Sequence, residues 1–106
     1  MTVGDWIRSR TAQSPAALTH EILVALGADS EASESRTAEL CLVAAKRSLA
    51  ALVGDNRFAR EHALELLAID ALTTFAFEHA SESDGGDEGL AMLANESAHV
   101  FGQLAG

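Results

Sequence analysis

Hydrophobic residues recur along this chain at spacings of three and four, which is the period of an amphipathic α-helix. Near the beginning, for example, Val3, Trp6 and Ile7 share one helical face. The sequence has no alternating run rich in Val, Ile and Thr, and no hairpin dipeptide between two such runs. The pattern therefore predicts an all-α protein.

Capping and turn residues divide this pattern into five predicted helices. Thr2 and Asp5 form a T-x-x-D start that resembles a capping box. Ser14 and Pro15 mark a second start, with Ser as the N-cap and Pro in the first turn, and Gly27 ends that helix. Three further helices are predicted over residues 33–53, 57–80 and 88–104.

Two acidic segments, residues 28–35 and 81–88, are expected to connect these helices at the surface. Each is long enough to reverse the chain between antiparallel neighbours. A chain of 106 residues has room for one domain. We therefore expect residues 1–106 to form a single helical domain, a small antiparallel bundle of four to five helices.

The third and fourth predicted helices are unusually apolar. In residues 33–53 the polar side chains occupy one narrow arc, so most of the circumference is apolar. About a fifth of the chain is Ala, which favours close helix packing but buries little area per residue. We expect the Ala-rich faces of these two helices to be covered by a second copy, so that the protein is a structural or interaction bundle that forms a homodimer.

The charge of the chain excludes several classes of partner. The formal net charge is −9, and the seven basic residues are scattered, so neither nucleic acid nor an anionic membrane surface is an expected partner. No run of about 18 apolar residues could span a bilayer. The first residues lack a continuous apolar segment typical of a signal peptide, and we expect a cytoplasmic protein.

Asp70 is the most unusual residue, because it lies inside the most apolar stretch of the chain, residues 64–77. On a helical wheel it shares a face with Leu66 and Thr74, which we interpret as the core face. A buried carboxylate needs hydrogen-bond donors or a cation, or else takes up a proton. We expect it to cap a neighbouring helix, accept from the Trp6 indole or pair with an Arg, and the Asp70→Ala change to cost about 1–3 kcal/mol.

The alternative interpretation of Asp70 is functional. Asp70, Thr73, Thr74 and Trp6 are the candidate site residues for a module that binds a small apolar or amphipathic ligand, with the carboxylate as its polar handle. The alternative role of Thr73 and Thr74 is structural: each hydroxyl can donate a hydrogen bond to a backbone carbonyl of its own helix. Both interpretations require Asp70 to face inward.

Residues 68–79 (AIDALTTFAFEH) resemble the G-D-A-L-L-x-x-A-F-E stretch of helical isoprenyl diphosphate synthases. The resemblance covers about a dozen residues. The D-D-x-x-D motifs that hold Mg²⁺ in that family are absent from this sequence, and Ile69 stands where the family has Gly. The resemblance therefore implies a shared way of packing helices and no active-site residue.

Little in the sequence predicts catalysis or a cofactor. Glu96 and His99 form the E-x-x-H spacing of di-iron bundles, but those sites need the motif twice, so we expect no metal. The single cysteine, Cys41, lies in an apolar run and is interpreted as a buried hydrophobic residue. No nucleophile has an identifiable base, so an enzyme is the least favoured class and no cofactor is expected.

Overall fold

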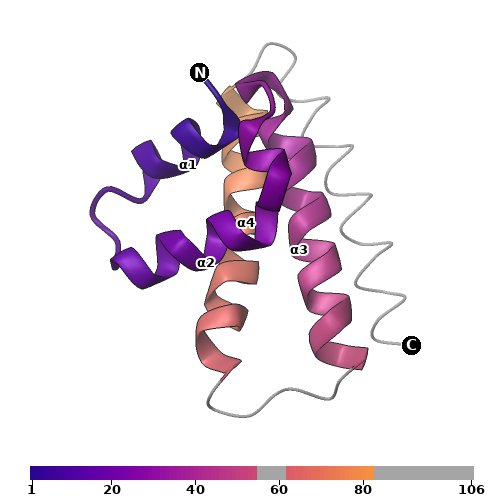
Figure 1. Ribbon diagram of the computed structural model, residues 1–106. Coiled ribbons are helices and arrows are strands. Elements are labelled where there is room, and N and C mark those ends of the chain that lie inside the picture. The colour runs from indigo at the N-terminus through magenta and orange to yellow at the C-terminus, as the bar shows by residue number, and fades with distance from the viewer. Residues whose placement is uncertain (55–61, 83–106) are drawn as a thin grey trace.

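The structure is a computed structural model, and it describes residues 1–54 and 62–82 (Figure 1). It confirms an all-α bundle. The described part contains four α-helices, joined between the second and third by two short 3-10 turns. The elements are α1 (Val3–Arg10), α2 (Ala16–Leu26), η1 (Gly27–Glu31), η2 (Glu34–Arg36), α3 (Thr37–Gly54) and α4 (Ala63–Glu82).

Helix α1 begins at the predicted capping box. The Asp5 backbone N–H donates to Thr2 Oγ1 at 3.1 Å, and the Thr2 backbone N–H donates to Asp5 Oδ2 at 3.0 Å. These two bonds satisfy N–H groups that have no partner inside the helix. The bond from the Thr2 backbone is the main cause that holds the pKa of Asp5 below its ordinary value.

Helix α2 begins one residue later than its predicted start. Pro15 is the N-cap residue, with φ −57° and ψ 138°, and no side chain caps the helix. The expected cap by Ser14 is therefore wrong; its backbone N–H donates instead to the Thr11 carbonyl at 2.9 Å, in the turn that ends α1. The predicted end of α2 at Gly27 is confirmed, and the positive φ of 58° there explains the glycine.

The segment between α2 and α3 is more ordered than an acidic surface loop. Besides η1 and η2, it pairs with the beginning of the chain: Val3 N–H donates to the Ala32 carbonyl at 2.9 Å, and Glu34 N–H donates to the Met1 carbonyl at 3.1 Å. A single antiparallel bridge between Thr2 and Ser33 lies between these bonds. The pairing fixes α1 against η2.

Helices α3 and α4 form an antiparallel pair, α2 packs across both, and α1 packs against α2 and the two 3-10 turns (Figure 1). Helix α4 ends at Glu82, two residues beyond its predicted end. The predicted helix over residues 88–104 and the predicted cap at residues 55–56 lie outside the described residues. Within the described helices, none is long and apolar enough to cross a membrane.

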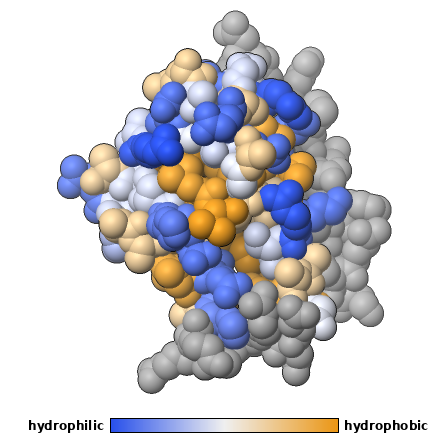
Figure 2. Space-filling view, viewed as in Figure 1, coloured by the Kyte–Doolittle hydropathy of each residue, from blue (hydrophilic) through white to orange (hydrophobic). Residues whose placement is uncertain are grey.

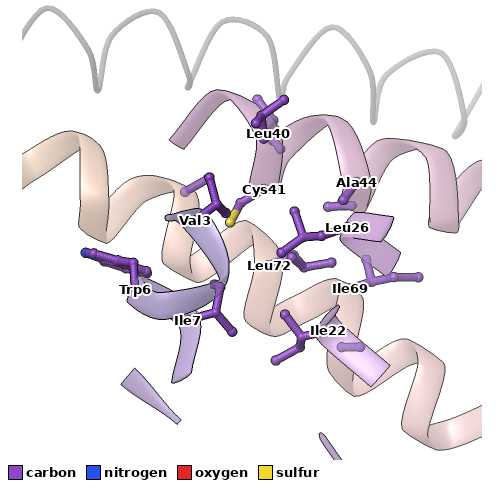
Figure 3. Packing of buried hydrophobic residues seen from close by; sticks show 14 of the residues in the cluster. Val3, Trp6, Ile7, Ile22, Leu26, Leu40, Cys41, Ala44, Ile69 and Leu72 are labelled. Carbon is purple, nitrogen blue, oxygen red and sulfur yellow. The ribbon is translucent and has the colours of Figure 1, made fainter. Parts of the chain in front are cut away.

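All four helices contribute to one hydrophobic cluster (Figure 3). Its most deeply buried large members, each under 2% exposed, are Val3, Ile7, Ile22, Leu26, Cys41, Leu52 and Leu72. On α3 the buried residues include Leu40, Cys41 and Leu42 in succession, so that helix is covered on more than one side. This agrees with its predicted narrow polar arc.

Candidate functional site

Asp70 is exposed, and the prediction that it faces the core is wrong. The helical wheel grouped Asp70 with Thr74 correctly, because both lie on one face of α4, but that face is turned to solvent. The buried face carries Ala68, Leu72 and Ala76 instead. Since α4 is apolar around most of its circumference, its periodicity did not distinguish the buried face from the exposed one.

We define the outward face of α4 as Ala63, Leu67, Asp70 and Thr74, which follow each other at spacings of four, three and four, and which are all exposed. Leu67 is 56% exposed, a large apolar side chain in water. Of the other candidate residues, Thr73 donates its hydroxyl to the Ile69 carbonyl at 3.0 Å, which is the local role that was open to it. Asp70 therefore has no buried site to serve.

Trp6 lies elsewhere, at the junction of α1 with the end of α4. It is 6% exposed, as expected for the residue that anchors a short helix. Its ring meets Phe75 and His79 edge-to-face, with centroids 5.7 and 5.3 Å apart and interplanar angles of 81° and 78°. The predicted grouping of Trp6 with Asp70 is thus replaced by a grouping with Phe75 and His79, which face α1.

A guanidinium covers this tryptophan. The Arg10 Cζ atom lies 4.5 Å from the centroid of the Trp6 ring, a cation–π contact. The same guanidinium forms ion pairs with Glu78, at 3.5 Å, and with Glu82. The hydrogen bond to Glu82 is the main cause that raises the pKa of Arg10 above its ordinary value. The cluster therefore already holds one cation between an aromatic ring and two carboxylates.

His79 is the functional candidate that the sequence did not reveal. It is 7% exposed, and its Nε2 lies 3.0 Å from Glu34 Oε1, which comes from η2, 45 residues earlier in the chain. His79 is nine residues after Asp70 and therefore lies on the opposite side of α4. Because Asp70 faces outward, this geometry accounts for the burial of His79. Its partner Glu34 lies in the segment interpreted as a simple surface connection.

A cavity of about 330 Å³ opens beside this pair, lined by Trp6, Glu34, Ser35, His79 and Glu82. The Ser35 hydroxyl is 3.1 Å from the Ser33 hydroxyl and forms no hydrogen bond with His79, so these residues do not form a nucleophile–base pair. The cavity brings together carboxylates, an imidazole and an indole. These groups are suited to binding.

Other candidate chemistry is weaker. Cys41 is fully buried, and this burial raises the pKa of its thiol to about 12, so the reactive thiolate is suppressed. No group of three or more metal-ligating side chains occurs within residues 1–54 and 62–82. Glu96 and His99 lie outside the described residues.

Comparison with protein-family models, with curated proteins and with solved structures finds no match to this chain. No relative therefore suggests a function.

Proposed function

We propose that this protein is an interaction module whose bundle associates with a second copy of itself, with the outward face of α4 at the centre of the contact. The observation that supports this proposal is Leu67, which is 56% exposed in the second turn of α4, a helix that is apolar around most of its circumference. Burying a leucine side chain stabilises a protein by about 1.5–3 kcal/mol. A monomer lacks this stabilisation at Leu67, because the side chain remains in water.

The residues around Leu67 suit close helix packing. Ala63 and Thr74 on the same face are small, and Ala71 and Phe77 at its edges are only half-buried. Small side chains let two helices approach closely, while larger ones at the edges extend the contact. The outward face thus has the composition of a helix–helix contact, interrupted by one carboxylate.

Helix α3 adds exposed apolar surface next to α4. Val43 and Val53 are 42% and 40% exposed, and α3 packs along α4 as its antiparallel neighbour. Figure 2 shows apolar surface near the middle of one face of the molecule. A specific interface needs about 800 Å² from each partner, so a contact must extend beyond Leu67 alone.

The proposal is tested by light scattering coupled to size exclusion at tens of micromolar. We expect the mass to be twice the monomer mass of 11.1 kDa, and Leu67→Glu to return it to the monomer mass. Val24→Glu is the matched control, because Val24 is 59% exposed but lies on α2. A monomeric wild-type chain, or equal dissociation by both substitutions, would refute the proposal.

A further inference from the structure

Within residues 1–54 and 62–82, two buried polar side chains of the Trp6–His79 cavity have hydrogen-bonding atoms to which no group is bonded. Trp6 and His79 are both more than nine-tenths buried and both line the cavity. Among the residues that the structure describes, none accepts a hydrogen bond from Trp6 Nε1, and none bonds to His79 Nδ1. Figure 3 shows the nitrogen-bearing end of Trp6 turned away from Val3 and Ile7. A buried N–H donor such as that of Trp6 Nε1 usually has an acceptor.

The charge around the cavity is negative. Glu34 and Glu82 line it, and Glu78 lies beside it, paired with the same guanidinium of Arg10 as Glu82, so three carboxylates and one guanidinium lie in or next to the cavity. The carboxylates are partly exposed; the Glu34 side chain, for example, is 36% exposed and accessible from the cavity. An anionic ligand would be repelled by this arrangement, and a cation would be attracted.

We propose that this cavity binds a small organic cation that also carries a hydrogen-bond acceptor, such as a primary ammonium joined to an amide by a short alkyl chain. The ammonium would bind Glu34 and Glu82, and the amide oxygen would accept from Trp6 Nε1–H. Arg10 supports the assignment, because its guanidinium already lies over the Trp6 ring and between carboxylates. A volume of about 330 Å³ is sufficient for a ligand of this size.

This inference does not depend on self-association. The cavity is formed by α1, η2 and the last turns of α4, whereas the outward face of α4 is centred on Leu67 and Asp70. A monomeric chain could bind the cation, and a dimer could fail to bind it. The two proposals are therefore separable by experiment.

The single tryptophan provides the readout, because Trp6 is the only one in the chain and lines the cavity. Its fluorescence is titrated at neutral pH with 4-aminobutanamide, butylammonium and butanamide. We expect a saturable change with 4-aminobutanamide, weaker binding of butylammonium, which lacks the acceptor, and no binding of butanamide, which lacks the charge. No saturable response to 4-aminobutanamide, or equal binding of butanamide, would overturn the proposal.

Substitutions locate the site. Glu34→Gln is expected to weaken binding of 4-aminobutanamide about tenfold, because a charge-assisted hydrogen bond becomes a neutral one. Glu39→Gln is the matched control: Glu39 lies on the exposed surface of α3, pairs with Arg36 and does not line the cavity. If circular dichroism shows that Glu34→Gln does not fold, Ser35→Leu is tested in its place. Ser35 is exposed and lines the cavity, so a larger side chain there is expected to weaken binding. The assignment of the ligand to this cavity would be refuted if the folded cavity variant bound 4-aminobutanamide as tightly as the wild type. It would also be refuted if Glu39→Gln weakened binding to the same extent.

Discussion

The orientation of α4 can be tested by comparing three alanine substitutions on that helix. Leu72 is fully buried in the hydrophobic cluster, Leu67 is 56% exposed, and Asp70 lies on the exposed face. Leu72→Ala and Leu67→Ala remove the same atoms from the same helix. The difference between their effects on the free energy of unfolding therefore reports burial, because both substitutions change helix propensity equally.

The burial of Leu72 sets the expected magnitude. Truncating a fully buried leucine to alanine costs about 2–5 kcal/mol, because transfer energy is lost and a cavity remains. In a domain of this size each kcal/mol lowers the melting temperature by about 4–8 °C, so we expect a decrease on the order of 10–30 °C. Leu67→Ala and Asp70→Ala are expected to stay within about 0.5 kcal/mol, as is usual for exposed positions.

Thermal and urea unfolding followed by far-ultraviolet circular dichroism measure these differences. The protein is kept at low micromolar concentration, because self-association would add stability by mass action. If Asp70→Ala costs as much as Leu72→Ala, the helix is turned by half a revolution relative to the structure. Equal effects of the two leucine substitutions would contradict the difference in burial between Leu67 and Leu72.

Two further predictions concern titratable groups. Burial raises the pKa of Cys41 from 9.0 to about 12, so its thiolate fraction at pH 8 is about a thousandfold smaller than in the unfolded chain. A disulfide reagent should therefore label Cys41 only after unfolding in urea. Rapid labelling of the native protein would contradict the burial of the thiol. The pKa of Asp5 is lowered in the folded state, so its stabilising contribution is present above its ordinary value of 3.8 and is lost as the pH falls below it. The difference in unfolding free energy between wild type and Asp5→Ala should therefore shrink on acidification from pH 7 to pH 3, and a constant difference would show that the carboxylate does not stabilise the cap.

The elements with local causes were predictable from the sequence. The capping box of Thr2 and Asp5 depends on residues three apart, and the end of α2 depends on Gly27 alone. The narrow polar arc of the third predicted helix likewise agrees with the burial of α3 on more than one side. Each of these features is decided by side chains within a few residues of one another.

The features that join distant segments were not predictable in the same way. The pairing of Met1 and Val3 with the linker before α3 is made of backbone hydrogen bonds, which leave no side-chain pattern. The contact between His79 and Glu34 likewise joins segments 45 residues apart, α4 and η2. The candidate cavity could therefore not be assembled from motifs alone.

Asp70 failed as a predictor for a different reason. A charge in an apolar stretch suggests a buried site only if the helix has one apolar face, and α4 has apolar residues nearly all round. In such a helix the single carboxylate lies on the exposed face, because an ionised carboxylate has its lowest free energy in water. The same argument assigns the opposite side, with His79, to the interior.

The position of Asp70 also limits how two copies could associate. It lies near the middle of the outward face, so a symmetric antiparallel pairing of two α4 helices centred there would bring the two carboxylates together. Burying both as charges would cost more than Leu67 contributes, whereas at the rim of the contact Asp70 would remain hydrated. A dimer built on this face must therefore be offset along α4, towards Ala63 and Leu67 and the adjacent surface of α3. This offset keeps the contact away from the Trp6–His79 cavity, which lies towards the other end of the helix.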